Sequence, residues 1–325
     1  MAARLRPRRR GGYARGVKSP QETDARPAAG LALVGYPRLT GLVIATVGAF
    51  ALGGGASAQA ATDLGTVDGT TYVGDTSSGT PPASAATDLP CPDDTRPVGA
   101  GFFVNPPNFI HDAYPADLLD PFGPGALESV RDQAWMASGP VPEIHGYGIC
   151  RSGPLSYRFD EGNLPATPRA RKLTAKCPDD RHILGGGASA GQGSVGAAYI
   201  SSSFPIDDGD RGKAPDDGWR AQVYGSDQDH ALAVAVCAKT VQRYGSDQGI
   251  TQNYFGLPSC KADEHLLAIG ARISGDPSEA QFIHATPNDS VDDGDDVPDD
   301  YAVVRGESTD PGEVNKAMDM FWVCG

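Results

Sequence analysis

Six cysteines divide the chain into alternating long and short intervals, and this rhythm constrains the fold more than any other feature of the sequence. They stand at Cys91, Cys150, Cys177, Cys237, Cys260 and Cys324, so that the long intervals measure 59, 60 and 64 residues. An even number of cysteines favours disulfides in an exported chain, although six cysteines allow fifteen pairings by count alone. The alternation predicts three repeated units, each closed by one disulfide across its long interval.

Other residues recur in register with these cysteines. Each unit has Tyr-x-x-Asp upstream of its first cysteine, an acid three residues after that cysteine and a glycine ten residues after it. The tyrosines are Tyr72, Tyr157 and Tyr244, the acids Asp94, Asp180 and Asp263, and the glycines Gly101, Gly187 and Gly270. We interpret the shared positions as a disulfide anchor, a turn acid and a small residue where strands meet. The stretches "CPDDTRPVGAG" and "CPDDRHILGGG" therefore mark a repeat, and we do not interpret them as a metal or phosphate site.

The units tile most of the chain. Repeat 1 covers residues 68–150, repeat 2 residues 151–237 and repeat 3 residues 238–325, and a short leader over 61–67 precedes them. The joints between units are short, which favours one body, while the sequence leaves open whether the repeats share one core.

Apolar residues alternate with a period of two, as half-buried strands require, and no stretch has a sustained helical period. In repeat 2 this pattern predicts strands over 183–189, 196–202, 219–224 and 231–237. Aligning the repeats makes Trp135, Trp219 and Tyr301 the starts of equivalent strands, and pairs His111 with His284. We expect an all-β fold of three repeats of about 85 residues, each a small antiparallel sheet with one internal disulfide. A β-prism-like pseudo-three-fold arrangement is a further expectation.

Three repeats of about four strands in an exported, disulfide-bonded chain resemble the β-prism layout of the vitelline membrane outer layer protein family. The likeness lies in repeat number and strand count, and the present repeats are longer. The Cys-Pro-Asp-Asp cassette, with its glycines and a closing strand that ends in Cys, also resembles repeats of uncharacterised exported proteins of actinobacteria. That resemblance implies no activity.

The N-terminal region has the features of a secretory signal. Basic residues precede an apolar run over residues 42–52, and small residues with A-x-A patterns end at residues 58 and 60. Eleven apolar residues are too few to cross a bilayer core of roughly 30 Å. We therefore expect residues 1–60 to be a signal peptide with a long basic region. The mature protein is expected outside the cell or on its surface, without a stable membrane span.

Charge narrows the possible partners. Residues 61–325 hold 18 of the 27 basic residues and 39 of the 41 acidic ones, which gives them a formal charge of −21. Such a body is repelled by phosphate backbones, so nucleic acid is not an expected partner.

No residue is predicted to be catalytic or to bind a metal. His182 and His265 occupy one repeat position, and repeat-equivalent residues usually serve the scaffold. Zinc-type His or Cys spacings do not occur in the sequence. The Asp-rich stretches 207–217 and 289–300 could hold calcium, because that ion takes clustered oxygen ligands, but they lack the EF-hand register.

The sequence thus favours a non-enzymatic, exported β-repeat protein with a binding or structural role at the cell envelope or outside the cell. A glycan or an envelope component is the expected partner. Trp135 and Trp219 are candidates for stacking on sugar rings. Two alternatives stay open: a secreted hydrolase with its site between repeats, and a calcium-binding, adhesin-like module.

Overall fold

The computed structural model describes residues 61–78, 85–105, 109–116, 134–139, 141–191, 198–207, 214–226, 230–240, 242–251, 255–256, 260–261, 263–289, 297–308 and 316–325. All of them belong to one compact unit, Gly55–Gly325. The expected signal peptide lies outside the described residues.

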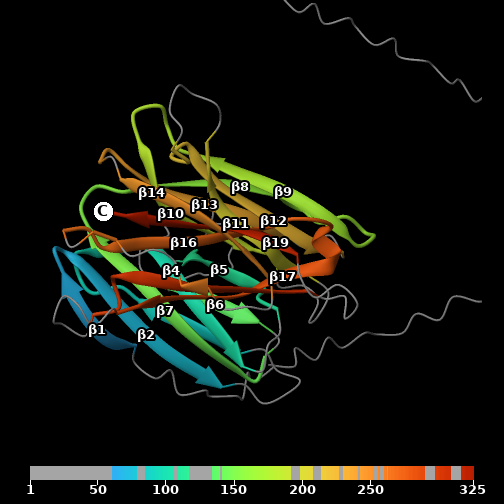
Figure 1. Cartoon of the computed structure of the whole chain (residues 1–325), viewed down its shortest axis with the longest axis horizontal. Helices are drawn as coiled ribbons and strands as arrows, with labels where there is room; N and C mark the ends of the chain where they lie inside the picture. Colours follow the sequence, from blue (N-terminus) through green and yellow to red (C-terminus); the bar gives the residue numbers. More distant parts are fainter. Residues whose placement is uncertain are drawn as a thin grey trace, which may run out of the picture. The chain divides into compact units, whose positions relative to one another are not determined.

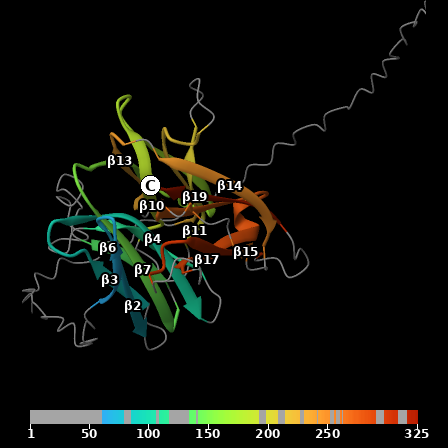
Figure 2. The same cartoon turned by 60° about the vertical axis from the view of Figure 1, so that its left-hand side comes forward.

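The described residues form three antiparallel sheets and one short 3-10 turn, η1 (Pro277–Glu279) (Figures 1 and 2). Sheet A has the order β1 (Thr62–Val67), β2 (Thr70–Ser78), β7 (Glu143–Ser152), β4 (Thr95–Asn105), β17 (Ala280–Asn288), β18 (Tyr301–Ser308), β15 (Phe255–Gly256). Sheet B has the order β3 (Ala85–Pro90), β6 (Ala134–Gly139), β5 (Asp112–Ala116), β10 (His182–Ser189), β13 (His230–Ala238), β8 (Ser156–Asn163). Sheet C has the order β14 (Arg243–Ile250), β19 (Ala317–Cys324), β16 (Leu266–Ile273), β11 (Tyr199–Ile206), β12 (Gly218–Gly225), β9 (Arg169–Lys176). The all-β prediction is confirmed.

The three predicted disulfides are also confirmed. They join Cys91 to Cys150, Cys177 to Cys237, and Cys260 to Cys324, one within each repeat. Within the described ranges no helix has the length and apolar character needed to cross a membrane.

The sheets follow a cyclic pattern that the expectation of one sheet per repeat did not include. Strands β2, β7 and β4 of repeat 1 share sheet A with β17, β18 and β15 of repeat 3. Sheet B joins repeat 2 to repeat 1 in the same order, and sheet C joins repeat 3 to repeat 2. Each repeat therefore contributes half of its strands to each of two sheets, which closes the three repeats into a ring of pairings.

Glycines mark the seams where strands from two repeats meet. A Cβ atom on Gly101 would lie 2.5 Å from the carbonyl oxygen of Ala285 on β17, and one on Gly187 would lie 2.1 Å from that of Ala113 on β5. Gly270 has the same relation to Ser203 on β11. The prediction of a small residue where strands meet is confirmed, because any side chain here would collide with backbone.

The three strands that follow the first cysteine of each repeat, β4, β10 and β16, approach one another at the centre (Figure 1). A Cβ atom on Gly99 would lie 1.9 Å from the Leu267 carbonyl oxygen, and one on Gly185 would lie 2.0 Å from that of Val98. Next to these positions each strand has an irregularity in its register, and the bulged residues, Val98, Leu184 and Leu267, lie in one hydrophobic cluster. The repeats thus share one core.

The repeated tyrosines fasten each repeat to the preceding one. The phenol of Tyr72 donates a hydrogen bond of 2.7 Å to the carbonyl of Leu266 in repeat 3. Tyr157 and Tyr244 donate in the same way to the carbonyls of Pro97 and Ile183. Each acceptor lies six residues after the first cysteine of its repeat, so the three bonds are equivalent.

The repeat has more strands than the four predicted. Strands β8 and β9 of repeat 2 have equivalents in β2 and β3 of repeat 1 and in β14 and β15 of repeat 3, which gives six strands per repeat. The four predicted strands of repeat 2 correspond to β10–β13. Residues 62–67, expected to be a loose leader, form β1 and pair with β2.

Two sequence alignments between repeats were shifted by one residue. Pro115 pairs with Trp135 and Pro205 with Trp219, but Pro287 pairs with Ala302 and not with Tyr301. Likewise, the pairing of β5 with β10 and of β17 with β4, across the seams between repeats, shows that His284 is equivalent to Asp112 and not to His111. Repeat 3 has one residue fewer between its "FI" pair and this proline. The sequence alignment placed this one-residue gap at the wrong position.

Candidate functional site

Trp135 and Trp219, the sequence candidates for stacking on sugars, are core residues. Their exposed fractions are 2% and 1%, so neither ring offers a face to a ligand. The Nε1 of Trp219 donates to the Ser203 hydroxyl at 2.8 Å. This corrects the prediction, since both tryptophans lie on the strand face that packs inward.

The outer faces of the three sheets are where the repeats differ. The cross-strand pair Gly74 and Tyr147 on sheet A is replaced by Phe159 and Val234 on sheet B, and by Ser246 and Phe321 on sheet C. The next cross-strand pair along the same strands and on the same face also differs between the sheets. Thr76 and His145 on sheet A correspond to Glu161 and Leu232 on sheet B, and to Gln248 and Asp319 on sheet C.

A groove of about 290 Å³ lies over sheet A at this divergent position. We call it the sheet A groove; it is lined by Thr62, Leu64, Gly74, Asp75, Thr76, His145, Gly146 and Tyr147. Strands β1, β2 and β7 supply these residues. Gly74 packs closely against the Leu64 side chain, since a Cβ atom there would lie 2.9 Å from it, so a larger residue at this position would have to displace Leu64.

The polar groups of the groove are held in place by short contacts. The Thr76 hydroxyl and the Nδ1 of His145 lie 2.8 Å apart, and the Asp75 carboxylate accepts the Thr76 N–H at 2.7 Å. The Nε2 of His145 is 3.6 Å from a carboxylate oxygen of Glu143. Tyr147 is half-buried, and this burial raises the pKa of its phenol, which therefore stays neutral at physiological pH. The groove thus combines an aromatic ring with a carboxylate, an imidazole and hydroxyl groups.

Two further rings continue from the groove across the seam with repeat 3. The Phe103 ring lies 5.5 Å from that of His145 and 5.0 Å from that of His284. His284 is buried, and its Nε2 lies 3.0 Å from the Thr286 hydroxyl. Burial, assisted by the charge of Arg305, lowers the pKa of His284 to about 4, so its ring is neutral at physiological pH.

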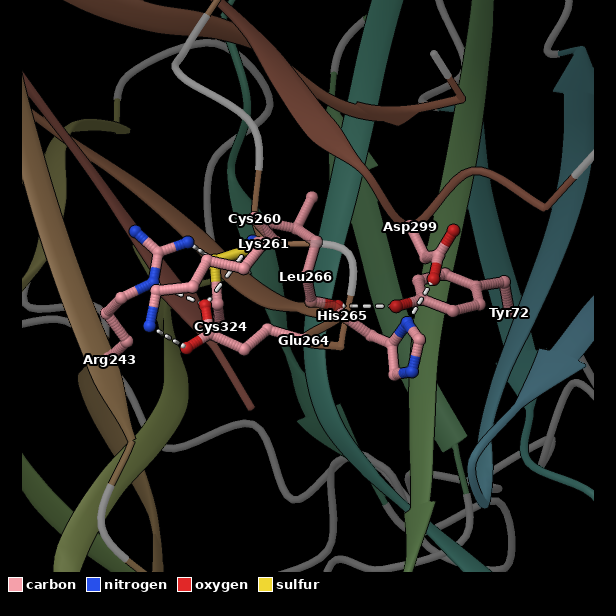
Figure 3. Close-up of a disulfide and its surroundings, with 9 residues drawn as sticks. All are labelled: Tyr72, Arg243, Cys260, Lys261, Glu264, His265, Leu266, Asp299 and Cys324. Carbon is pink, nitrogen blue, oxygen red and sulfur yellow. Dashed lines mark hydrogen bonds and ion pairs between the residues drawn. A yellow bond between two sulfur atoms is a disulfide. The ribbon is translucent and has the colours of Figure 1, made fainter. Parts of the chain in front are cut away.

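The histidines at the shared repeat position hold the scaffold together. The Nδ1 of His182 lies 2.7 Å from Asp216, and His265 makes the equivalent contact with Asp299 (Figure 3). The carbonyls of the same two aspartates accept the N–H groups of Ile183 and Leu266. These contacts fix the segment before the second-to-last strand of each repeat, β12 or β18, against the turn that follows its first cysteine.

Figure 3 shows that the contact in repeat 3 adjoins the Tyr72 hydrogen bond and the Cys260–Cys324 disulfide. Arg243, Glu264 and Lys261 form an ion-pair cluster beside the disulfide. Burial raises the pKa of Tyr72 well above its usual range, and the nearby Asp299 acts in the same direction. The phenol therefore remains a hydrogen-bond donor.

Most of the two Asp-rich stretches, residues 208–213 and 290–296, lies outside the described residues, so calcium binding there stays a prediction. Among the residues that are described, no group of three or more His, Cys, Asp or Glu side chains could hold a metal ion.

Sequence reasoning did not find the sheet A groove. Asp75 belongs to the repeated Tyr-x-x-Asp motif, but Gly74 and His145 lie outside the repeated positions, and nothing local distinguishes these two from other strand residues. The available signal was that the residues of repeat 1 differ here from those at the equivalent positions of the other repeats. This difference becomes visible only when strands β2 and β7 are aligned with β8 and β13.

The chain matches no protein-family model, and a search of curated proteins gave no match. The function is therefore inferred from the residues of the site.

Proposed function

We propose that this chain is an exported, non-enzymatic binding protein that holds a saccharide in the sheet A groove. The observation that supports the proposal most directly is the groove of about 290 Å³ that Tyr147, His145 and Asp75 line. Sheets B and C have Phe159 and Ser246 at the position of Gly74. Three disulfides and the predicted signal peptide support a location outside the cell, where disulfides persist.

The lining suits a sugar. Pyranose rings offer an apolar face that packs on an aromatic ring, and hydroxyl groups that bond to carboxylate, imidazole and hydroxyl partners. A volume of about 290 Å³ is close to the lower end of ordinary ligand pockets, roughly 300–1,000 Å³. We therefore expect the groove to bind one or two sugar units of a larger glycan.

The contacts around His145 favour binding over hydrolysis. A hydroxyl, an imidazole and a carboxylate lie in sequence at Thr76, His145 and Glu143, as in a nucleophile site. However, the 3.6 Å separation between His145 and Glu143 is too long for a firm hydrogen bond. The Thr76 N–H is bonded to Asp75, so it cannot stabilise an oxyanion.

The test is a glycan-array screen of the disulfide-bonded protein secreted from the full-length chain, followed by calorimetry with the best glycan. Gly74→Phe, which reproduces the residue of sheet B, should lower affinity at least tenfold by filling the groove. Ser246→Phe is the matched control at the equivalent exposed position of sheet C and should leave affinity within twofold. Equal glycan affinity in Gly74→Phe would refute the assignment, as would failure to bind any glycan. Hydrolysis of a nitrophenyl ester or glycoside that is lost in Thr76→Val would favour the hydrolase.

A further inference from the structure

Repeat 2 has a cationic surface that the equivalent strands of repeat 1 lack. On the outer face of sheet C, Lys172 pairs directly with Gln222, and Thr174 pairs directly with Arg220. Directly paired residues of antiparallel strands point to the same face. The intervening residue Leu173 is buried in the core, so Lys172 and Thr174 point away from it.

The described acids beside this face are bonded to other groups, and the nearest of them, Asp160, accepts the Thr174 backbone N–H at 2.6 Å. Among the described residues, Lys172 has no ion-pair partner, and the contact that orients Arg220 is a hydrogen bond of 3.1 Å from its Nε to the Thr174 hydroxyl. The 3-10 turn η1 lies against β9 and β12, but its acid Glu279 pairs with Lys316. Asp276, which precedes the turn, accepts hydrogen bonds from Ser278.

The equivalent strands of repeat 1 lack this charge, whereas in repeat 3 Arg305 occupies the position of Gln222. On sheet B, the strands β3 and β6 carry Ala86 where Lys172 stands, and Met136 where Arg220 stands. Asp88 occupies the position of Thr174. In a body with a formal charge of −21, the exposed Lys172 and the half-buried Arg220 on one sheet face create a local field for an anionic partner.

Aromatic rings extend the same face. Tyr224 follows Gln222 on the same face of β12, and its ring centroid is 5.5 Å from that of Tyr199 on β11. Phe109 continues the row, with its ring 5.7 Å from Tyr199. Tyr199 and Tyr224 are both half-buried, so part of each ring is accessible.

We propose that the cationic face, formed by Lys172, Thr174, Arg220, Gln222, Tyr199 and Tyr224, binds a carboxylated polysaccharide. Lys172 and Arg220 pair with its carboxylates, and Gln222 and Thr174 bond to its hydroxyl groups. The tyrosines pack on its sugar rings. A flat sheet face suits an extended chain, and carboxylates spaced along a sugar polymer are sparser than nucleic-acid phosphates, which the acidic body repels more strongly.

The experiment measures binding of the secreted, disulfide-bonded protein to polygalacturonate and to its fully methyl-esterified form, which has the same rings without charge. Lys172→Gln combined with Arg220→Gln should lower affinity for polygalacturonate at least tenfold. The control Lys239→Gln combined with Lys261→Gln removes the same charge from two exposed lysines that are paired with acids elsewhere, and should change affinity less than twofold. Tyr224→Ala should weaken binding at least threefold.

The proposal fails if the Lys172/Arg220 variant binds polygalacturonate as the wild type does, or if the esterified polymer binds equally well. Tighter binding of polyphosphate or single-stranded DNA would assign the face to phosphate polymers. Gly74→Phe should retain polygalacturonate binding, so the sheet A groove and the cationic face succeed or fail independently.

Discussion

Two buried histidines limit the pH range over which the folded protein is stable. Burial lowers the pKa of His111 from 6.5 to about 4, and burial together with Arg305 does the same for His284. His111 stacks on Phe109, and its buried Nε2 has no hydrogen-bond partner among the described residues. Both rings are therefore held in the neutral form by a folded environment that does not accommodate a charge.

This arrangement predicts loss of stability in acid. Between pH 6.5 and 4 the unfolded chain binds protons that the folded chain does not, so the free energy of unfolding falls as pH is lowered. The stabilisation is complete above pH 6.5, and its loss is of the order of 3 kcal/mol per histidine, since one pKa unit corresponds to about 1.4 kcal/mol.

We expect His111→Phe to remove about half of this acid sensitivity, because it keeps the ring on Phe109 and removes the titrating group. Urea unfolding at pH 7.5, 5.5 and 4 measures the effect. His230→Phe, at an exposed histidine, serves as the control and should keep the wild-type slope. An unchanged pH dependence in His111→Phe would show that other groups govern acid unfolding.

Between elements, the repeated tyrosines replace a second disulfide as the link from one repeat to the next. Each disulfide closes a loop inside its own repeat, whereas each tyrosine donates to a carbonyl of the preceding repeat. Burial raises the pKa of Tyr244, and the nearby Asp216 and Asp217 act in the same direction. The phenol thus stays protonated and keeps its bond to Ile183.

Tyr244→Phe should therefore lower the free energy of unfolding by about 1–2 kcal/mol, because the buried carbonyl of Ile183 loses its phenol partner. Chemical denaturation of oxidised protein at pH 7.5 measures the change. Tyr301→Phe is the matched control, since the Tyr301 phenol has no hydrogen-bond partner among the described residues, and it should be neutral within about 0.5 kcal/mol. Equal stability of the two variants would argue against the tyrosine link.

For the molecule as a whole, the cyclic sharing of sheets makes the three repeats interdependent. Removing repeat 3 would leave sheet A without β17, β18 and β15, and sheet C without β14, β19 and β16. Strands β4 and β11 would then present unpaired edges beside an opened core, and an exposed edge of this kind favours aggregation.

A chain ending at residue 237 should therefore fail to fold cooperatively, although it keeps four cysteines and one complete sheet. Chemical-shift dispersion in nuclear magnetic resonance spectra and urea unfolding, both compared with the complete secreted protein, test whether the shortened chain folds. Two independently folded repeats in the shortened chain would contradict a shared core.

Several features followed from residues close together in sequence. The cysteine spacing predicted the disulfides, because each pair lies in one repeat and recurs three times. The repeat has a glycine at a position where no Cβ atom fits, in Gly101, Gly187 and Gly270. The recurrence of this glycine therefore predicted where strands from two repeats meet. Strands β10–β13 were predicted from apolar alternation, whereas β8 and β9 were missed because they are mostly polar.

The sequence by itself thus determined the repeat, the disulfides and the all-β class, since each depends on a spacing or a period within one unit. Only the tertiary structure decided which repeats share a sheet, which face of a strand meets the core, and where equivalent positions diverge. A period of two places a side chain on one of two faces but does not say which face is covered, and Trp219 was misjudged for that reason. The sheet A groove and the cationic face arise from the pairing of distant strands, and only that pairing brings their residues together.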